Sequence, residues 1–464
     1  MDGQTLPIVA IVGQPNAGKS TLLNKIARKP LAVTSDLAGT TRDRQYVDTI
    51  WSGTEFTLVD TAGLSLDARE GLELNLLKQI EVALDEADII IFVADGKEPV
   101  TAIDRNVLAK FRKIKKPLLL AINKADSPAK RREQTGEFAR LGIKAMFAVS
   151  AINGGGIGDM LDFIVDSLKQ LGLDKNQKIK PTGIAVSILG KPNVGKSSIF
   201  NAILKQERVV VSPIPGTTRT AIDEDIVIDG VDYTFIDTAG LKKKEHRQTQ
   251  PDIYSGFQSF KAIRRSDVCF LVLDANEEVT KQDQRVASEI FAMQKGCIIL
   301  ANKIDLYSET AKAGARRGES GRIIKSGEEE YPRLRDYISH HFPFLSMCPV
   351  FFISAVSGTG LDEAISAIKP IYDRRLKTIE PEALQEFLDK KMKQNPPKLL
   401  RDQKKPKVLG LKQLAANPPL FELYVNYPAA ISSQFRKFVE NGIIRELDFY
   451  GTPITLKLRG KDKS

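Results

Sequence analysis

The feature that most constrains the fold of this chain is an internal repeat with a period of 177 residues. A period of this length is typical of two complete domains, because stacked short repeats recur every 20 to 50 residues or so. Three motifs return at this offset, and a fourth returns at 179. They are Gly-x-Pro-Asn-x-Gly-Lys-Ser (13–20 and 190–197), Gly-Thr-Thr-Arg (39–42 and 216–219), Asp-Thr-Ala-Gly (60–63 and 237–240) and Asn-Lys-x-Asp (123–126 and 302–305).

Each copy alternates short apolar runs with segments of helical periodicity. This alternation predicts a mostly parallel sheet with helices on both faces, so the expected class is α/β, with two tandem P-loop domains and a small α+β unit after them. In the first copy we expect strands at 7–13, 57–60, 89–94, 118–123 and 145–150, and helices at 19–28, 72–84, 103–114 and 158–171.

The repeat also predicts the domain boundaries. We expect a first domain at 1–171, a polar linker at 172–181, a second domain at 182–370 and a third unit at 371–464. The Ser-Ala pairs at 150–151 and 354–355 are 204 residues apart, so the second copy gains 25 residues after its Asn-Lys-x-Asp motif. Within that insertion, residues 311–330 are rich in Gly, Arg, Glu and Ser, which predicts a mobile surface loop.

The first motif is a phosphate-binding loop between a strand and a helix. Its glycines let backbone N–H groups face phosphate oxygens, and the following helix adds the positive end of its dipole. Lys19 and Lys196 are expected to reach the β- and γ-phosphates, and Ser20 and Ser197 to ligate Mg²⁺. The predicted contacts of the two loops are Gly13, Gln14, Pro15, Asn16, Ala17, Gly18, Lys19, Ser20 and Thr21, and Gly190, Lys191, Pro192, Asn193, Val194, Gly195, Lys196, Ser197 and Ser198.

The Asn-Lys-x-Asp motif selects the base. The carboxylate of Asp126 or Asp305 can accept from both N1–H and the 2-amino group of guanine, and adenine offers neither donor. Asn123 and Asn302 are expected to hold the loop. Lys124 and Lys303 are expected along the nucleotide, and Ser150, Ala151, Ser354 and Ala355 around the base.

The remaining repeated motifs suit the γ-phosphate and its metal. Asp60 and Asp237 end apolar strands, where a carboxylate can hold the Mg²⁺ shell, and Thr41 and Thr218 are expected to cap Mg²⁺ from flexible loops. Gly63 and Gly240 can turn toward the γ-phosphate. Leu64 and Leu241 stand where many GTPases carry a water-orienting glutamine, which predicts slow unaided hydrolysis. The other predicted contacts of these motifs are Thr61, Ala62, Thr238 and Ala239.

Composition and charge distribution indicate the cellular compartment and the kind of partner. Cys269, Cys297 and Cys348 show no disulfide or metal spacing and are expected to be buried hydrophobes. No apolar run approaches membrane-spanning length and no secretory signal is visible, so we expect a cytoplasmic protein. We also expect it to be a monomer. The net charge is +10, and residues 371–464 hold 19 basic and 11 acidic residues, a surplus of +8. That concentration favours a polyanionic partner such as nucleic acid, with an unspecific solvated face as the alternative.

The third unit is predicted to have the order α-β-β-α-β, with helices at 381–393 and 432–440 and strands at 408–414, 420–426 and 454–458. That order is compatible with a KH-like fold, but residues 371–464 contain no Gly-x-x-Gly, the backbone clamp of RNA-binding KH domains. The basic run 404–407 could contact phosphates, or the unit could pack against the other domains. We expect its aromatic residues to be core: Phe387, Phe421, Tyr424, Phe435 and Phe438.

Taken together, these motifs resemble the Der (EngA) family of bacterial double-Era-like GTPases, over almost the whole chain. The segments Asn-Pro-Pro-Leu-Phe-Glu-Leu-Tyr-Val-Asn at 417–426 and Gly-Thr-Pro-Ile at 451–454 look like that family's KH-like domain. The resemblance implies GTP hydrolysis, a role in assembling the large (50S) ribosomal subunit, and domain rearrangement with nucleotide state. It also implies that Asn16 and Asn193 help bind K⁺, unless they only shape the loop.

The sequence departs from the family pattern in two places, and the family's residue roles cannot be transferred there. Asp43 follows the first Gly-Thr-Thr-Arg, but Thr220 follows the second, and the insertion at 311–330 has no counterpart in the pattern. Two other functions remain as alternatives: an oligomerising GTPase scaffold and a tRNA-modifying GTPase. The absence of a helical stalk counts against the first, and the absence of a helical middle domain and a C-terminal catalytic cysteine counts against the second.

Overall fold

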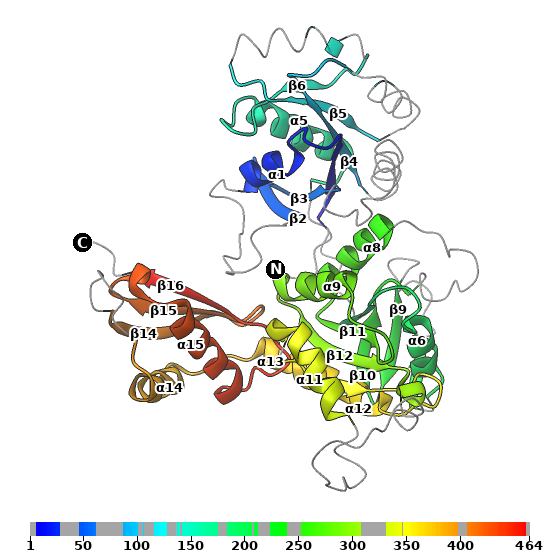
Figure 1. The fold of residues 1–464 in the computed structure, drawn as a ribbon, viewed down its shortest axis with the longest axis vertical. Coiled ribbons are helices and arrows are strands. Elements are labelled where there is room, and N and C mark those ends of the chain that lie inside the picture. Colours follow the sequence, from blue (N-terminus) through cyan, green and yellow to red (C-terminus); the bar gives the residue numbers. More distant parts are fainter. Residues whose placement is uncertain are drawn as a thin grey trace, which may run out of the picture. The chain divides into compact units, whose positions relative to one another are not determined.

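We describe the protein from a computed structural model. The described residues are 6–27, 46–61, 87–100, 105, 116–127, 136, 138–139, 142–174, 183–206, 208–211, 223–238, 252–307, 331–345, 347–397 and 406–460. The chain divides into two compact units, one comprising 4–179 with 247–258, and the other 1–3, 180–246 and 259–464. Figure 1 shows the elements along the chain.

The first unit contains a six-stranded sheet in the order β2-β3-β1-β4-β5-β6. All neighbours pair in parallel except β2 and β3, which are antiparallel. This confirms the predicted class. Its elements are β1 (Ile8–Gly13), α1 (Lys19–Ala27), β2 (Tyr46–Trp51), β3 (Thr54–Asp60), β4 (Ile89–Asp95), β5 (Leu118–Asn123), β6 (Met146–Ala148) and α5 (Ile157–Gln170).

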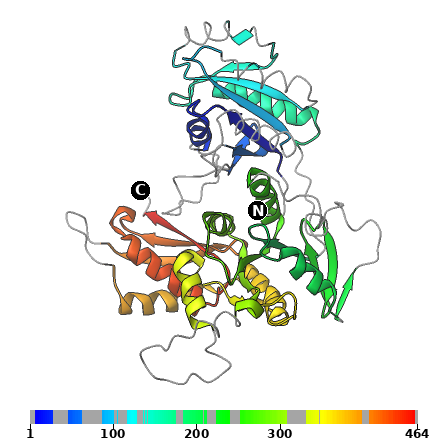
Figure 2. The same cartoon turned by 45° about the vertical axis from the view of Figure 1, so that its right-hand side comes forward.

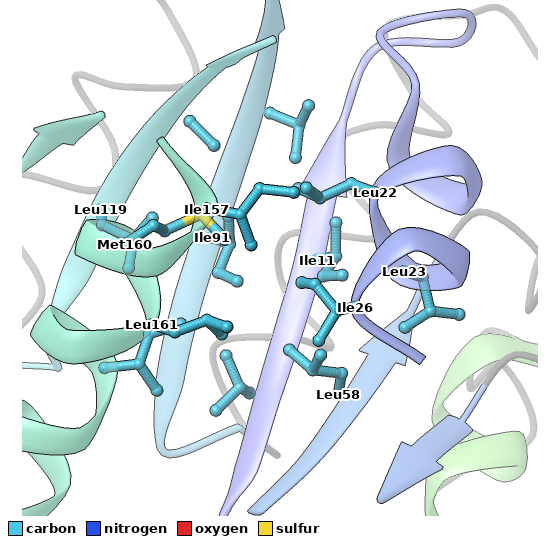
Figure 3. Packing of buried hydrophobic residues seen from close by; sticks show 14 of the residues in the cluster. Ile11, Leu22, Leu23, Ile26, Leu58, Ile91, Leu119, Ile157, Met160 and Leu161 are labelled. Atoms are coloured by element: carbon cyan, nitrogen blue, oxygen red, sulfur yellow. The ribbon is translucent and has the colours of Figure 1, made fainter. Parts of the chain in front are cut away.

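Both faces of this sheet are buried, which explains why its strands are continuous apolar runs. Helices α1 and α5 cover one face, where Leu22, Ile26 and Leu161 pack on strand residues such as Ile11 and Ile91 (Figure 3). The opposite face carries a second cluster around Val12, Phe92 and Phe138. The predicted helix at 72–84 lies outside the described residues, as does 103–114 except for Arg105.

The second copy repeats the architecture with a seven-stranded sheet, β13-β12-β11-β7-β10-β9-β8. Helices α6, α12 and α13 pack on one face, and α9 and α11 on the other. Its elements are β7 (Ile184–Leu189), α6 (Lys196–Leu204), β8 (Val209–Val211), β9 (Glu224–Ile228), β10 (Val231–Phe235), α8 (Asp252–Arg265), β11 (Val268–Asp274), α9 (Lys281–Ala292), β12 (Gly296–Asn302), α11 (Pro332–His341), the 3-10 turn Pro343–Leu345, β13 (Val350–Phe352), α12 (Leu361–Ser366) and α13 (Ile368–Leu376).

Sequence reasoning missed one antiparallel hairpin in each copy. In the first copy β2 turns into β3 through Ser52 and Gly53, whose φ angles are 47° and 79°; in the second copy β9 turns into β10 through Asp229 and Gly230, with φ angles of 50° and 77°. Two successive residues with positive φ are the requirement of a tight hairpin turn. In the second copy, the Asp-Gly dipeptide at 229–230 was the available signal.

The third unit has the predicted order α-β-β-α-β. Its sheet is β14-β15-β16, with β15 antiparallel to β14 and parallel to β16. Helices α14 and α15 pack against one face of this sheet around Phe421, Phe435 and Val439 (Figure 1). The elements are α14 (Pro381–Gln394), β14 (Val408–Ala415), β15 (Leu420–Val425), the 3-10 turn Pro428–Ala430, α15 (Ser433–Glu446) and β16 (Thr455–Gly460).

This small domain is anchored on the second P-loop domain, with which it shares one unit (Figure 2). Gly451 is the centre of the contact: its N–H donates to the Met347 carbonyl at 2.8 Å, and its carbonyl accepts from the Cys297 N–H at 3.0 Å. The guanidinium of Arg375, only 3% exposed, donates to the Gln294 carbonyl and to Asn417. Backbone pairing and a buried cation therefore fix this junction.

The three cysteines are free and buried, as predicted. Among the residues that the structure describes, none of the helices combines the length and apolarity needed to cross a membrane.

Candidate nucleotide sites

Each P-loop connects the first strand of its sheet to the first helix. Gly13 closes β1, and Lys19 opens α1; Gly190 follows β7, and Lys196 opens α6. The loop requires glycine at its close approaches. A Cβ on Gly13 would lie 2.3 Å from the Val93 carbonyl oxygen, and a Cβ on Gly18 would lie 2.3 Å from the amide nitrogen of Asn123. The repeated glycines are therefore steric requirements of the loop.

The two P-loop lysines curl back over their own loops. Lys19 Nζ donates to the carbonyls of Gly13 and Gln14 at 2.8 and 2.7 Å, and Lys196 Nζ donates to those of Gly190 and Lys191 at 2.7 and 2.7 Å. Burial lowers the pKa of Lys19, although Asp60 opposes the shift, and burial lowers the pKa of Lys196 to about 8. Both ammonium groups are thus already largely removed from water, which is why their pKa values fall.

The two copies differ at the aspartate of Asp-Thr-Ala-Gly. In the first, Asp60 is the last residue of β3, is 3% exposed, and accepts a 2.5 Å hydrogen bond from the Ser20 hydroxyl. In the second, β10 ends at Phe235, and Asp237 lies two residues beyond it with φ at 59°. Its N–H donates to Asp223, which also binds the Arg265 guanidinium. Identical motifs therefore place this aspartate on different backbone in the two copies.

The Asn-Lys-x-Asp asparagines join the base loop to the P-loop in both copies. Asn123 Nδ2 donates to the Ala17 carbonyl at 2.8 Å, and its Oδ1 accepts from the Ala151 N–H at 3.0 Å. The equivalent distances for Asn302, to Val194 and Ala355, are 2.8 and 3.1 Å. The structure thus brings together three motifs, of which the P-loop is more than a hundred residues away from the other two.

Asp126, the carboxylate predicted to read the base in the first copy, has two polar neighbours. Asp126 Oδ1 accepts from the Ser150 hydroxyl at 2.9 Å, and its Oδ2 lies 3.5 Å from Lys97 Nζ. In the second copy Asn276 stands at the position of Lys97, and its side-chain amide donates to the Lys303 carbonyl at 3.0 Å. The predicted base site of the first copy therefore has a cation beside it, where the second copy has an amide.

The motif lysines are positioned by aspartates that sequence reasoning missed. Lys124 Nζ pairs with Asp95 at 2.5 Å, and Lys303 Nζ pairs with Asp274 at 2.6 Å. Burial works to raise the pKa of Asp274, but the Lys303 ammonium and Asn276 outweigh it and lower that pKa. The signal was present in the repeat, since Asp95 and Asp274 end equivalent strands 179 residues apart.

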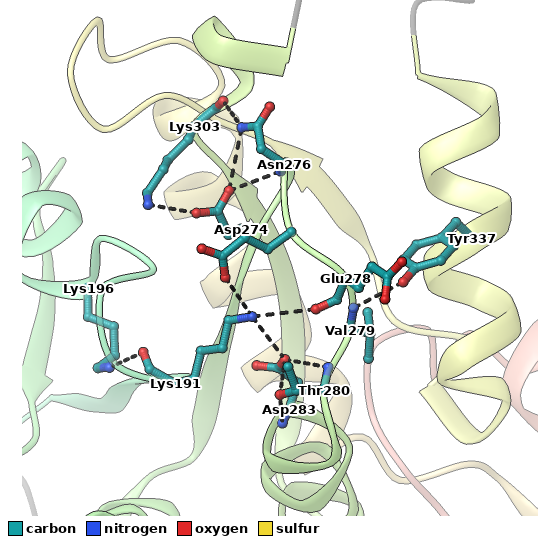
Figure 4. Close-up of polar contacts among 11 residues, drawn as sticks. Lys191, Lys196, Asp274, Asn276, Glu278, Val279, Thr280, Asp283, Lys303 and Tyr337 are labelled. Atoms are coloured by element: carbon teal, nitrogen blue, oxygen red, sulfur yellow. Dashed lines mark hydrogen bonds and ion pairs between the residues drawn. The ribbon is translucent and has the colours of Figure 1, made fainter. Parts of the chain in front are cut away.

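Lys191 forms a further network that is specific to the second copy (Figure 4). Its Nζ lies 2.8 Å from Glu277 and 3.7 Å from Asp283, and its side chain is 12% exposed. Burial acts to lower the pKa of Lys191, but Glu277 and Asp283 act more strongly in the opposite direction, so the pKa lies above its ordinary value. Asp283 also closes the capping box of α9 with Thr280. The first copy has Gln14 at this position, so sequence reasoning treated both as loop contacts.

Several remaining predicted residues are described. Pro15, Asn16, Thr21, Pro192 and Asn193 are exposed on or beside the loops, and Thr61 Oγ1 donates to the Ile11 carbonyl at 2.9 Å. Ser197 and Ser198 are half-buried in α6, and Thr238 is buried. Outside the described residues lie Thr41, Ala62, Gly63, Leu64, Thr218, Ala239, Gly240 and Leu241, together with the insertion at 311–330.

The geometry therefore presents two P-loop sites, each with a lysine folded over the loop, an asparagine that ties the Asn-Lys-x-Asp loop to the P-loop, and the aspartate predicted to read guanine. A chain with two such sites in succession belongs to the class of tandem GTP-binding P-loop proteins. A family model described as "50S ribosome-binding GTPase" matches residues 8–124 and again 185–303. A second, described as "KH-domain-like of EngA bacterial GTPase enzymes, C-terminal", matches residues 378–459.

Relatives that match over almost the whole chain identify the family. GTPase Der of Clostridium kluyveri is 35% identical over 453 residues, covering 98% of each chain. GTPase Der of Lactobacillus johnsonii is 36% identical over 455 residues, covering 98% of this chain and 99% of that one. The chain belongs to the Der (EngA) family and is a GTPase. A solved structure of Era in complex with MgGDPNP and a piece of 16S ribosomal RNA covers 60% of the chain and 91% of its own, at 24% identity and a TM-score of 0.28, and we infer nothing from it.

Proposed function

We propose that this GTPase acts in assembly of the large ribosomal subunit, binding it when its sites hold GTP. The observation that supports this most directly is the combination of two complete guanine sites with a KH-like domain whose region carries a surplus of +8. The family model for both G domains is described as "50S ribosome-binding GTPase". A cytoplasmic monomer with boundaries at 1–171, 182–370 and 371–464 completes the proposal.

In this proposal the described residues bind and orient GTP. Lys19 and Lys196 move from loop carbonyls to the β- and γ-phosphates, and Asp126 and Asp305 accept from guanine. Ser20 and Asp60 place a hydroxyl and a carboxylate 2.5 Å apart, which is the hard-oxygen pair that Mg²⁺ prefers. Mg²⁺, when bound, neutralises charge that develops on the phosphates. Ser197 with Asp237 has the same role in the second site, and Thr41 and Thr218 complete the two shells.

K⁺ is the proposed second cation. Asn16 and Asn193 have φ of 64° and 66° and are exposed on their loops, so their side chains are available to a cation beside the phosphates. Leu64 and Leu241 cannot orient water, and positive charge near the leaving oxygen would compensate for this. GTP turnover is expected to be slow in NaCl and faster in KCl, and Asn193→Ala should reduce the difference between the two salts. Equal rates in both salts would exclude this role.

Hydrolysis is proposed to change how the domains sit on the subunit, because loops that order on the γ-phosphate relax when it leaves. The test is co-sedimentation of the full chain with purified ribosomal subunits, with a non-hydrolysable GTP analogue, with GDP and without nucleotide. Binding to the large subunit with the analogue, lost in Lys19→Ala or Lys196→Ala, is the expected result. Intact GTP hydrolysis without binding in any state would overturn the proposal and favour an oligomerising scaffold.

A further inference from the structure

The face of the three-stranded sheet that α14 and α15 leave uncovered has its own chemistry. Strand alternation assigns residues to the two faces: Leu411, Phe421, Leu423 and Leu456 are buried under the helices. Their neighbours on each strand project from the opposite face. Tyr424 is one of these residues, so the expectation that it belongs to the core was wrong. Phe387, Phe421 and Phe435 are core residues, as predicted, and Phe438 packs at the edge of the core.

Strand register arranges this uncovered sheet face in rows. Gly410, Tyr424 and Arg459 are cross-strand partners in one row, and Lys412, Glu422 and Lys457 are partners in the next. Lys412, Lys457 and Arg459 are exposed, and Tyr424 is half-buried. Gly410, the cross-strand partner of Tyr424, has no side chain, and a Cβ built there meets nothing within 4 Å. The face thus combines an aromatic residue, a cross-strand neighbour without a side chain and three cations.

Glu422 sits at the centre of the uncovered sheet face. Its side chain is 10% exposed, and its Oε2 lies 3.7 Å from Arg459 Nη1 without accepting a hydrogen bond from any described residue. A buried carboxylate oxygen without a donor is costly, so it favours a ligand that brings N–H groups. The amino groups and ring N–H groups of nucleic-acid bases are such donors.

We infer that single-stranded RNA binds this uncovered sheet face, with a base stacked on Tyr424, phosphates against Lys412, Lys457 and Arg459, and a base donor on Glu422. Sequence-tolerant binding of single strands rests on stacking together with cations that follow the backbone. RNA-binding KH domains hold the RNA backbone with a Gly-x-x-Gly loop, which this domain lacks, so the proposed RNA contact is made by the sheet instead. This inference rests on the proposed ribosomal function.

A protein partner fits the same face less well. Among the described residues of this sheet, the exposed leucines are Leu409 and Leu414, both on the edge strand β14, and the centre of the face is charged. The core of a protein interface is depleted of charged residues, whereas nucleic-acid surfaces are enriched in cations.

The test measures fluorescence anisotropy of a labelled, unstructured RNA of about 12 nucleotides with the full chain. Tyr424→Ala should weaken binding about tenfold, and Tyr424→Phe should keep it, because the ring supplies the stacking. Lys457→Gln with Arg459→Gln should lower the slope of log affinity against log salt by about 0.7 for each cation removed. The matched control is Lys393→Gln with Lys437→Gln, two exposed lysines on α14 and α15.

The control pair should bind RNA within about twofold of the parent chain, because those lysines lie on the helical side of the domain. GTP hydrolysis and the thermal transition should be the same in every variant. Undiminished binding by Tyr424→Ala, or no binding of the oligonucleotide at low salt, would overturn the inference. Loss of subunit binding by Tyr424→Ala with RNA binding intact would assign the face to a ribosomal protein and overturn it as well.

The same variants separate this inference from the proposed function. If the chain binds the large subunit but not the oligonucleotide, the ribosomal proposal stands and the RNA face is rejected. If Tyr424 controls oligonucleotide binding but the chain ignores the subunit in every nucleotide state, the RNA face stands and the ribosomal proposal falls.

Discussion

The side-chain amide of Asn302 donates a 2.8 Å hydrogen bond to the carbonyl of Val194, and so ties the base-reading loop to the P-loop. Asn302 is 2% exposed and also accepts from Ala355. Because one side chain joins three segments, the guanine pocket and the phosphate loop are positioned together. The same arrangement in the first copy, through Asn123 and Ala17, shows that it belongs to the repeat and not to one domain.

Asn302→Ala should therefore weaken guanine nucleotide binding at the second site by more than tenfold, because two buried partners lose their hydrogen bonds. Gly195→Ala should do the same by displacement, since its Cβ would lie 2.3 Å from Asn302 Nδ2 at a φ of 98°. Titration with a fluorescent GDP in a chain whose first site carries Asn123→Ala isolates the second site. Unchanged affinity in both variants would contradict the role of the tie.

Some of these features could be predicted from the sequence and others could not. The motifs identify Lys19, Asn123 and Asp126 because a phosphate or a guanine needs those residue types at that spacing. The motifs are silent on Lys191, because its partners Glu277 and Asp283 depend on where the loop after β11 lies against the P-loop. The sequence also does not show that Asp60 ends its strand whereas Asp237 lies two residues beyond its strand, because the Asp-Thr-Ala-Gly motif is identical in both copies.

The second site should take up a proton when nucleotide binds at mildly alkaline pH. Burial lowers the pKa of Lys196 from 10.5 in the unfolded chain to about 8, so part of the population is neutral at pH 8 to 9. Phosphate charge raises that pKa again. Calorimetric titration with GDP in two buffers of different ionisation enthalpy should show proton uptake at about pH 8.5 and almost none at about pH 6.5. Asp126→Asn removes the first site from the signal.

The same group affects stability without nucleotide. Its pKa is lower in the folded than in the unfolded chain, so between about pH 8 and 10.5 the unfolded chain binds more protons. The Lys196 contribution to stability should therefore rise with pH across that window. Lys196→Met removes the titrating group and should flatten this rise in urea unfolding measured at several pH values. A parent chain whose Lys196-dependent stability falls across the window would contradict the depressed pKa.

Base selection should follow the carboxylate. Asp305→Asn replaces an acceptor for two guanine donors with an amide that offers one acceptor and one donor. Affinity for GDP at the second site should fall by about 100-fold or more, and affinity for xanthosine diphosphate should rise, because xanthine has a carbonyl where guanine has its 2-amino group. Competition binding with both nucleotides measures the change. Retained preference for guanine would show that Asp305 does not read the base.

Lys191→Gln tests whether the cation stabilises the second P-loop. Removing the ammonium takes away the cation that lies 3.7 Å from Asp283, whose side chain is 2% exposed, although Thr280 still donates to it. The free energy of unfolding should fall by about 1 kcal/mol, measured by urea denaturation. Lys205→Gln makes the same charge change at an exposed lysine that ends α6 and should have almost no effect. Equal losses of unfolding free energy in both variants would show that the Lys191 effect comes only from the change in net charge.

Gly451→Ala tests the junction between the KH-like and second P-loop domains. Gly451 has φ of 80°, and a Cβ there would lie 2.8 Å from Ile371, whereas Gly230 has φ of 77° with nothing within 4 Å. Both substitutions force an alanine into left-handed backbone, at about 1 to 2 kcal/mol. Only Gly451→Ala adds the clash, so it should lower the unfolding free energy by at least about 1 kcal/mol more than Gly230→Ala. Because Gly451 pairs with both Met347 and Cys297, that difference should include weaker docking, visible as faster hydrogen exchange of the Cys297 N–H in Gly451→Ala alone. Equal stability and equal exchange in the two variants would show that the domains do not depend on this contact.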